Sequence, residues 1–194
     1  MRYPAEHKEE TRERIVHAAS RRFRRGGASV GIAELMKALK LTHGGFYRHF
    51  KSKDALFVAA LEDAFEDMRA KVRTAVQQAA PGHELQSIIE TYLTEVHCAD
   101  ASGGCPVAAL SQEVARQSPS VRKAFDRAIK DAASAISRFM SGGSDEERGL
   151  KAGVLLSGMA GTLALARAVS NAQLRRNILA AARRVYTEAF VHDR

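Results

Sequence analysis

Hydrophobic residues recur at every third or fourth position along most of this chain, and the strict alternation typical of a half-buried strand is almost absent. Glycine, proline, serine and asparagine residues interrupt this pattern and divide it into separate segments. The predicted helices cover about 15–25, 32–39, 42–50, 52–80, 84–97, a short stretch after 106, 118–139, 144–170 and 171–190. The pattern therefore predicts an all-α protein with nine helices and no sheet.

Capping residues mark several of these boundaries. Thr42 is suited to N-cap the third helix, because its hydroxyl oxygen can accept a hydrogen bond from a free N–H of the first turn. Ser118 before Pro119 is a favoured pair at a helix start, and Ser144 with Glu147 fits a capping box. These starts support the helical prediction independently of hydrophobic spacing.

Length and composition narrow the class of protein. A chain of 194 residues with 45% hydrophobic content can bury a substantial core. No stretch of 18 or more residues is purely apolar, and the charged start of the chain lacks the apolar segment of a secretory signal. Two cysteines do not provide a disulfide framework. We therefore expect a cytoplasmic protein with no membrane partner.

Positive charge is concentrated near the start of the chain. Residues 1–53 hold 13 Lys and Arg against 5 Asp and Glu, whereas residues 54–194 hold 17 of each. The whole excess of +8 therefore lies in the first part. A basic segment joined to a neutral body is typical of a protein that binds nucleic acid, although such asymmetry can also serve only solubility.

Residues 35–53 have the layout of a helix-turn-helix, with a short helix, a tight turn, a second short helix and basic residues. Phe46 and Phe50, four positions apart, would fix one face of the second of these helices on the core. The opposite face then presents His43, Tyr47 and Arg48 to solvent. Arg48 and His43 are suited to base edges, and the Tyr47 hydroxyl to a phosphate oxygen. This segment predicts a double-stranded DNA partner.

The candidate DNA contacts lie on this exposed face or beside it. They are Ser29, Lys40, Thr42, His43, Gly44, Gly45, Tyr47, Arg48, His49, Lys51 and Lys53. Two glycines inside a helix cost about 1 kcal/mol each relative to alanine, and a close approach of the backbone to DNA would explain them. The alternative is a frayed helix start. For any single side chain, the alternative is an ordinary solvated residue.

These motifs resemble the TetR/AcrR family of transcriptional repressors. The resemblance covers about residues 11–57 and rests on Thr-x-x-x-Ile at 11–15, Ala18-Ala19, Phe23, Gly26-Gly27, Ile-Ala-Glu-Leu at 32–35, Thr-His-Gly-Gly-Phe-Tyr-Arg-His-Phe at 42–50 and Lys-Ser-Lys-Asp-Ala-Leu at 51–56. It implies a DNA-binding domain over 1–53 and a helical ligand-binding and dimerisation domain over 54–194. It also implies a homodimer whose interface is a four-helix arrangement of the last two helices of each subunit.

Two positions depart from the family pattern. Ser29-Val30-Gly31 stands where the family usually has Thr or Ser at the start of the second helix, so a phosphate contact there shifts to Ser29 or is lost. Lys40 stands in the turn where the family often has Gly. A left-handed conformation at a lysine costs about 1–2 kcal/mol, unless the turn differs.

The remaining part of the chain has none of the motifs of serine hydrolases, zinc proteases or nucleotide-binding loops. We therefore expect a protein that is not an enzyme and that needs no cofactor or metal. Apolar side chains near the fourth helix are the candidate contacts of a small-molecule inducer, although such stripes more often form only core. These candidates are Met68, Tyr92, Leu93, Cys105, Phe125 and Ile129.

His97, Cys98 and Cys105 flank a glycine-rich break. Two thiols at this spacing can form a disulfide, react with an electrophile or contribute to a metal site that would need further ligands. Cys105 precedes Pro106 at a helix start, where the helix dipole can lower the pKa of a thiol. The alternative interpretation is two small half-buried side chains beside a loop.

Small residues in the eighth helix allow close packing, across a dimer interface or within one subunit. They are Gly153, Gly158 and Gly161, and the matching stripe of the ninth helix is Ile178, Ala182, Val185 and Ala189.

Together the sequence predicts a ligand-responsive DNA-binding transcriptional regulator, a repressor released from a near-palindromic operator by a small inducer. A thiol-based redox or electrophile sensor that uses Cys98 and Cys105 is the alternative within this class. Two rival classes are a small helical enzyme and a non-specific architectural DNA-binding protein. The neutral body argues against the second rival, since an architectural protein needs no such domain.

Overall fold

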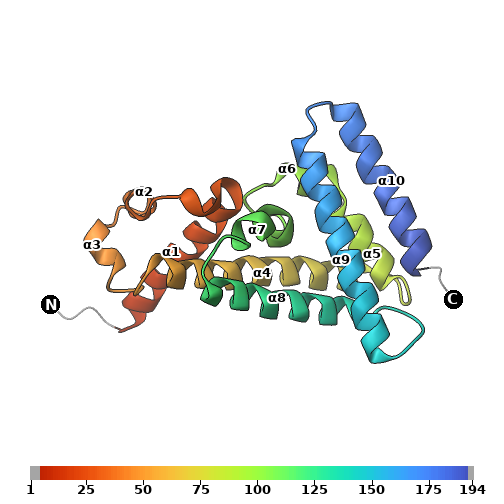
Figure 1. Ribbon diagram of the computed structural model, residues 1–194, viewed down its shortest axis with the longest axis horizontal. Helices are drawn as coiled ribbons and strands as arrows, with labels where there is room; N and C mark the ends of the chain where they lie inside the picture. The colour runs from red at the N-terminus through yellow and green to blue at the C-terminus, as the bar shows by residue number, and fades with distance from the viewer. Residues whose placement is uncertain (1–4, 192–194) are drawn as a thin grey trace.

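The computed structural model describes residues 5–191, which fold into ten α-helices and one short 3-10 helix, with no strand in that part of the chain (Figure 1). The elements are α1 (Ala5–Gly26), η1 (Gly27–Ser29), α2 (Ile32–Ala38), α3 (His43–Phe46), α4 (Lys53–Gln78), α5 (Glu84–Tyr92), α6 (Glu95–Ala99), α7 (Pro106–Val114), α8 (Pro119–Ser137), α9 (Asp145–Ala168) and α10 (Ala172–Val191). The all-α class is confirmed. Residues 1–4 and 192–194 of the two predicted domains lie outside the described residues.

The predicted count of nine helices is one too low, because the helix expected over 84–97 is two helices. α5 ends at Tyr92, and α6 begins after Thr94, whose side-chain oxygen accepts a hydrogen bond from the His97 backbone N–H at 3.1 Å. Threonine side chains favour such new starts because they satisfy a free N–H that helix continuation would otherwise have to pair. The hydrophobic spacing runs across both helices and hides the break.

The predicted caps are confirmed at two helices and wrong at a third. Ser144 and Glu147 form both hydrogen bonds of the capping box at the start of α9. Pro119 occupies the first turn of α8 as predicted, but Ser118 makes no side-chain cap there. Its hydroxyl oxygen lies 2.9 Å from that of Ser120 instead. The proline removes one of the N–H groups that a cap would otherwise serve.

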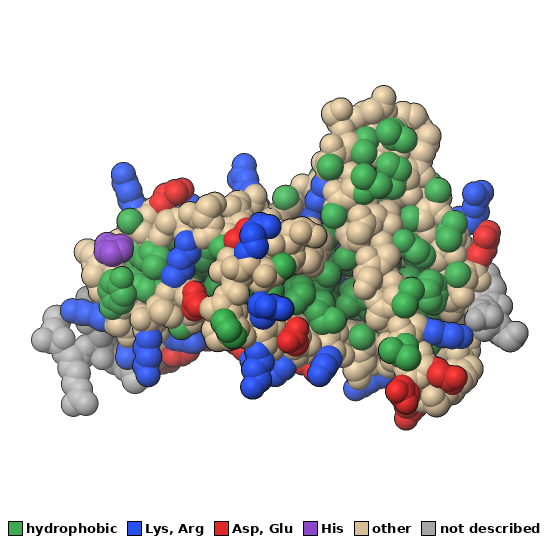
Figure 2. All heavy atoms as spheres, viewed as in Figure 1, with side chains coloured by type: hydrophobic (Ala, Val, Ile, Leu, Met, Phe, Trp, Pro, Cys, Tyr) green, Lys and Arg blue, Asp and Glu red, His purple; other side chains and the backbone are tan. Residues whose placement is uncertain are grey.

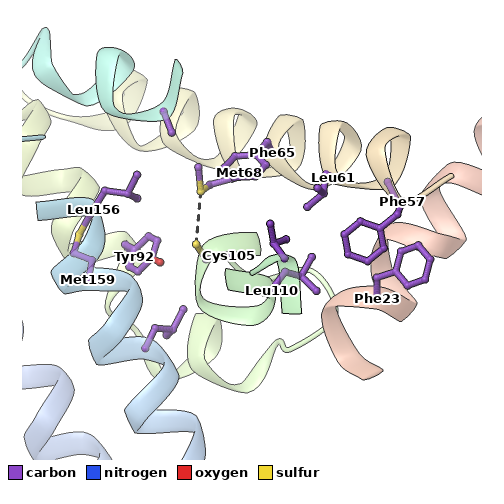
Figure 3. Close-up of a cluster of buried hydrophobic side chains, with 14 of the residues drawn as sticks. Phe23, Phe57, Leu61, Phe65, Met68, Tyr92, Cys105, Leu110, Leu156 and Met159 are labelled. Carbon is purple, nitrogen blue, oxygen red and sulfur yellow. Dashed lines mark hydrogen bonds between the residues drawn. The ribbon is translucent and has the colours of Figure 1, made fainter. Parts of the chain in front are cut away.

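α4 is the long element that both halves of the molecule share. α1, α2 and α3 lie toward one end of it, α8 runs alongside it, and α5, α9 and α10 gather toward the other end (Figure 1). The rings of Phe23 in α1 and Phe57 in α4 pack with centroids 4.7 Å apart (Figure 3). Buried side chains form one continuous cluster from Ile15 to Leu179. The predicted boundary at 53/54 therefore falls in the first turn of α4, and the core continues past it.

α9 is long and apolar enough, by length and composition alone, to cross a membrane, with a mean hydropathy of 1.4 in its most apolar window. The core helix of a soluble protein passes the same test. Leu155, Met159 and Leu163 are fully buried inside the molecule, and 39% of that apolar window is buried.

Candidate DNA-binding surface and ligand cavity

The turn between α2 and α3 has the geometry expected from its sequence. Lys40 has a φ of +58°, so it takes the left-handed conformation that usually belongs to glycine. The Lys40 N–H donates to the Lys37 carbonyl at 3.0 Å, and the Leu41 N–H donates to the Met36 carbonyl at 2.9 Å. This pair of bonds is a Schellman motif, which ends α2 and turns the chain toward α3.

α3 is a single helical turn held from both ends. The Thr42 side-chain oxygen accepts a hydrogen bond from the Gly45 N–H at 3.2 Å, which confirms the predicted N-cap. Phe46 is fully buried and stacks on buried Phe50 with ring centroids 5.7 Å apart. Tyr47 lies on the opposite side and is 61% exposed, with the His43 ring against its edge. The helix is shorter than predicted, because it ends at Phe46 instead of Phe50.

The two glycines of α3 face different surroundings. A Cβ atom on Gly44 would meet no other atom within 4 Å, so this glycine borders open space on the exposed face. A Cβ atom on Gly45 would lie 3.3 Å from the Thr42 side-chain oxygen and 3.8 Å from Met36. Gly45 therefore serves the packing of the turn, and Gly44 is the glycine that leaves the backbone accessible from solvent.

The other candidate DNA contacts differ in how freely they reach solvent. Arg48 and Lys51 are exposed. Ser29 is exposed, but its hydroxyl donates to the Gly26 carbonyl at 2.9 Å. The Lys53 ammonium donates to the Ala28 carbonyl in the middle of η1. His49 is half-buried, and burial together with the nearby positive charges lowers the pKa of its side chain, so that it is neutral at pH 7.

Two adjoining cavities of about 220 and 340 Å³ lie beside α4 in the body of the molecule. Both are lined mainly by apolar side chains, and Met68, Val72, Ile88 and Tyr92 line both of them. The smaller one is closed by α6 and by the segment that leads to Cys105, and the larger one by α8 and α9. Concave, mostly apolar spaces of this kind are the usual form of small-molecule sites.

A cluster of sulfur and aromatic groups forms the wall that the cavities share. The Cys105 thiol contacts the Met68 sulfur at 3.8 Å, and the Tyr92 hydroxyl points toward Cys105 (Figure 3). The Tyr92 ring packs edge-on against the His97 ring at 4.6 Å. His97 Nε2 accepts a hydrogen bond from the Cys105 N–H at 3.1 Å, so its Nδ1 carries the proton donated to the Tyr92 carbonyl at 2.6 Å. Both nitrogens of His97 are thereby used.

Burial controls the ionisation of the three titratable side chains in this wall, Cys105, Tyr92 and His97. It raises the pKa of the Cys105 thiol, and it outweighs the hydrogen bonds at the start of α7 that act in the opposite direction. The lowered thiol pKa considered from the sequence is therefore wrong. Burial also raises the pKa of Tyr92 well above its ordinary value and lowers the pKa of His97. All three groups are uncharged at neutral pH, as an apolar cavity requires.

The segment 100–105 leaves no space for side chains at its two glycines. A Cβ atom on Gly103 would lie 2.5 Å from an Asp100 carboxylate oxygen, and one on Gly104 would collide with the Arg167 guanidinium. Lys71 donates to the Gly103 carbonyl at 2.6 Å. Arg167 donates to the carbonyl groups of residues 97, 98 and 100 at 3.1 to 3.2 Å. These bonds hold the cavity wall from α4 and from α9.

Arg24 of α1 joins the same wall to the DNA-binding end. Its side chain is fully buried and donates to the Gly104 carbonyl at 3.2 Å and to an Asp67 carboxylate oxygen at 2.7 Å. It also bonds the hydroxyl of Ser20, one turn earlier in α1, at 3.1 Å. One guanidinium thus connects α1, α4 and the residue next to Cys105.

Comparison with known proteins decides the family. The model described as bacterial regulatory proteins, tetR family, matches residues 15–60, and the model described as transcriptional regulator LmrA/YxaF-like, C-terminal domain, matches residues 81–185. The chain belongs to the TetR family. Its resemblance to this family in the helix-turn-helix thus extends through the body, and the TetR-family assignment from the sequence is confirmed.

Several TetR-family relatives cover most of the chain. The HTH-type transcriptional repressor NemR of Escherichia coli K12 is 28% identical over 140 residues, 70% of each chain. The HTH-type transcriptional regulator LmrA of Bacillus subtilis 168 is 26% identical over 154 residues, 77% of this chain and 82% of LmrA.

Solved structures show the same fold. The reduced form of E. coli NemR aligns with a TM-score of 0.74 over 89% of this chain and 95% of that one, at 22% identity. A TetR-family regulator from Cytophaga hutchinsonii aligns with a TM-score of 0.76 over 93% and 95%, at 19% identity.

Three of the six ligand contacts predicted for this TetR-family member line the cavities, namely Met68, Tyr92 and Cys105. The other three line neither cavity and need correction. Leu93 is fully buried in the core, and Phe125 packs edge-on against Phe65 with ring centroids 5.8 Å apart. Ile129 is half-buried against the same core. Their helical faces point at neighbouring helices, which spacing alone does not distinguish from a cavity.

Sequence reasoning missed the polar residues that hold the cavity wall, which are Arg24, Lys71 and Arg167. Charged side chains on helices are normally interpreted as exposed, and nothing local in the sequence contradicts that interpretation. Three potential metal ligands, on His17, Asp63 and Asp67, lie within 4.8 Å of one another. Asp67 already accepts the Arg24 hydrogen bond and His17 is exposed, so we assign no metal to them.

Proposed function

We propose that this TetR-family protein is a ligand-responsive repressor. A homodimer presents α2 and α3 of each subunit to successive major-groove segments of a near-palindromic operator, and a small molecule in the cavity beside α4 releases it. The relatives named NemR and LmrA, a transcriptional repressor and a transcriptional regulator, support the regulatory part of this proposal. The excess charge of +8 in residues 1–53 supports the DNA-binding part.

The observation that carries the proposal is the position of Arg24. It bonds the cavity wall at Gly104, belongs to the first helix of the DNA-binding end, and is ion-paired with Asp67 of α4. A ligand that displaces the segment 103–105 therefore acts on α1 and α4 through a single buried group. Such a displacement changes the separation of the two DNA-binding ends of the dimer, each formed by α1, α2 and α3. The operator-bound conformation then loses population.

The coupling required is modest. A 100-fold loss of operator affinity corresponds to about 2.7 kcal/mol of difference between the two conformations. Rearranging a few charge-assisted hydrogen bonds such as those of Arg24 and Lys71 is sufficient, since each contributes about 1.5–3 kcal/mol. The proposal therefore needs no large rearrangement of the core.

The candidate DNA contacts divide into two roles. Arg48 and His43 read base edges, because both project from the exposed side of the recognition turn. Tyr47, Lys40 and Lys51 bind phosphates and set affinity and register. His49 and Lys53 support the turn from beside it and do not supply a free positive charge to DNA. His49 is neutral, and the Lys53 ammonium bonds the Ala28 carbonyl.

The homodimer forms through α9 and α10. Apolar side chains gather over these two helices (Figure 2), and the large exposed ones are Leu150, Val154, Leu165, Leu174 and Val185. A Cβ atom on Gly153 or Gly161 would meet no atom within 4 Å, whereas Gly158 packs on the Tyr186 hydroxyl inside the subunit. The first two glycines therefore favour close helix packing with the partner, and Gly158 makes room for Tyr186 of α10.

The protein acts in the cytoplasm, without catalysis and without a cofactor.

Thiol chemistry at Cys105 is the second candidate for the response. Its position in the cavity lining favours it, and a solved relative carries the description of a reduced form. Burial raises the pKa of this thiol, however, which disfavours the nucleophilic thiolate. We therefore favour non-covalent binding. Under this proposal, Cys105→Ser protein retains the ligand response, and its complete loss would favour the thiol sensor.

The test of the function is binding of the purified full-length protein to its own upstream DNA and to a scrambled sequence over a salt series. The proposal expects a complex with one dimer per site that prefers the upstream DNA at about 0.15 M salt. Weak binding that is equal on both sequences and collapses with salt would leave only the phosphate contribution and would favour the architectural alternative.

A further inference from the structure

The Tyr92 hydroxyl is a buried donor whose only near acceptor is the weakly accepting thiol sulfur of Cys105. Tyr92 is only 7% exposed, and its oxygen has no hydrogen-bond partner within the described residues. A buried polar group without a partner is costly, so native proteins retain few of them outside functional sites. His97, which touches the ring, has no free nitrogen to offer. The described part of the chain therefore offers the Tyr92 hydroxyl sulfur alone, and no oxygen or nitrogen acceptor.

The position of this hydroxyl ties it to the cavities. Tyr92 lines both of them, and its oxygen points toward the place where the sulfur atoms of Met68 and Cys105 meet (Figure 3). Methionine side chains are flexible and adapt their packing readily. Met68 is thus the side chain that can move aside and let a ligand atom reach Tyr92.

The charged side chains that line the smaller cavity, Lys71 and Asp100, are paired, whereas the exposed Arg138 also borders the larger cavity. Lys71 donates to the Gly103 carbonyl and lies 3.9 Å from Asp100. Arg69 and Arg73, which border the larger cavity, both bond Glu66 at 2.8 Å. A charged ligand would have to break one of these pairs or remain unpaired in apolar surroundings, which is strongly unfavourable. The smaller cavity therefore favours an uncharged ligand.

We propose that the site takes an uncharged, mostly apolar molecule with a single hydrogen-bond acceptor, which accepts a hydrogen bond from the Tyr92 hydroxyl. The inference rests on the proposed function, because it names the class of molecule that acts at the same cavity. Since an apolar cavity of about 150 Å³ holds a benzene ring, the smaller cavity of about 220 Å³ has room for a larger ring system. The ligand class is thus a ring compound with one carbonyl-like oxygen.

Three naphthyl compounds of similar shape test this inference. 2-Acetylnaphthalene carries a carbonyl acceptor, 2-isopropenylnaphthalene replaces its oxygen with carbon, and 2-naphthoate is an anion. Equilibrium dialysis against the full-length protein, with each compound followed by the ultraviolet absorbance of its naphthyl group, measures the three affinities. The variants are Tyr92→Phe and, as matched control, Tyr186→Phe, whose hydroxyl lies 3.1 Å from that of Thr162 and away from the cavities.

We expect wild-type and Tyr186→Phe protein to bind the ketone about tenfold more tightly than the hydrocarbon. Tyr92→Phe should bind both equally while it keeps its affinity for the hydrocarbon, and naphthoate should bind at least about 100-fold more weakly than the ketone. Three results would overturn the inference: a ketone preference that survives in Tyr92→Phe, naphthoate binding as tight as that of the ketone, or no binding of any probe.

A second measurement on the same samples separates this inference from the proposed function. Operator release is followed with labelled upstream DNA at saturating 2-acetylnaphthalene. Ketone binding that depends on Tyr92 but leaves the operator complex intact supports the ligand class and contradicts ligand-controlled release. Release by naphthoate but not by the ketone contradicts the ligand class and supports the function.

Discussion

In the recognition turn, the hydrogen bonds that fix the backbone join residues three to five positions apart, such as Gly45 to Thr42 and Leu41 to Met36. The wall of the cavity is held by arginines that are 67 to 80 positions from the groups they bond. The backbone bonds of the turn are therefore set by its local sequence, although burial of Phe46 and Phe50 in the core also holds it. The cavity wall is bonded to α1, α4 and α9, so its geometry depends on how those helices are arranged.

The largest expected effect is the loss of unfolding free energy when a buried arginine is replaced, compared with the loss at a more exposed one. Arg24→Met leaves the Gly104 carbonyl and Asp67 without their partner, and we expect it to lower the free energy of unfolding by about 3 kcal/mol. Arg22→Met, which removes an exposed ion pair to Glu34, should cost less than about 1 kcal/mol. Denaturant unfolding of both variants checks this. Equal small losses would mean that Arg24 does not hold the wall.

Arg48 tests the reading role of the turn. Arg48→Ala should lose about 1–3 kcal/mol of discrimination at one operator position, because base contacts carry the sequence preference. Lys51→Ala should weaken binding to all sequences and reduce the salt dependence, since a phosphate contact carries no sequence information. Binding to a panel of operator variants distinguishes the two. Unchanged selectivity in Arg48→Ala would contradict its role.

The two glycines of α3 should respond in opposite ways. Gly44→Ala introduces a methyl group into open space, so we expect it to stabilise the fold by about 0.5 kcal/mol and to weaken operator binding. Gly45→Ala places the methyl group 3.3 Å from the Thr42 oxygen, and we expect a loss of about 1 kcal/mol through the cap. Thermal unfolding and operator titration measure both. If Gly44→Ala binds the operator normally, the backbone at 44 does not approach DNA.

The smallest effect concerns pH. Burial lowers the pKa of His97 from its ordinary value of 6.5, so the unfolded chain binds the proton more readily than the folded protein. His97 therefore contributes stability that is fully present above pH 6.5 and is lost as the pH falls through the lower pKa of the folded protein. His97→Gln should reduce the loss of unfolding free energy as the pH falls. The part of that loss that comes from His49, whose pKa is also lowered, should remain. Denaturant unfolding of wild-type and His97→Gln protein over a pH series checks this, and equal pH dependence in the two proteins would contradict it.

The contrast between short-range bonds in the turn and long-range bonds in the cavity wall explains what the sequence could predict. The Thr42 cap depends on neighbours within a few residues, and the four-residue spacing of Phe46 and Phe50 indicates their shared buried face, so local reasoning found both. For Lys40 the sequence left a left-handed residue and a different turn open, and the structure shows the first. The TetR-family resemblance likewise rests on residues 11–57 alone, and the family model of the DNA-binding part covers residues 15–60.

The cavity was predicted only in part. Met68, Tyr92 and Cys105 were found because they are apolar and near α4, whereas Phe125 has the same character and packs against Phe65 instead. The burial of Arg24 depends on Gly104, which lies 80 residues away, and no local pattern encodes that contact. The same limit applies to the break at Thr94, where a capping hydroxyl overrides continuous hydrophobic spacing.

The most direct test of communication between the cavity and the DNA-binding end fills the cavity without any ligand. Val72 lines both cavities, so Val72→Phe occupies part of the space that the inducer would take. Operator affinity of this variant is measured by fluorescence anisotropy at constant salt, beside its thermal unfolding and dimer state. The account predicts a folded dimer that binds the operator at least about tenfold more weakly, a coupling of about 1.4 kcal/mol. A folded Val72→Phe dimer with wild-type operator affinity would contradict it.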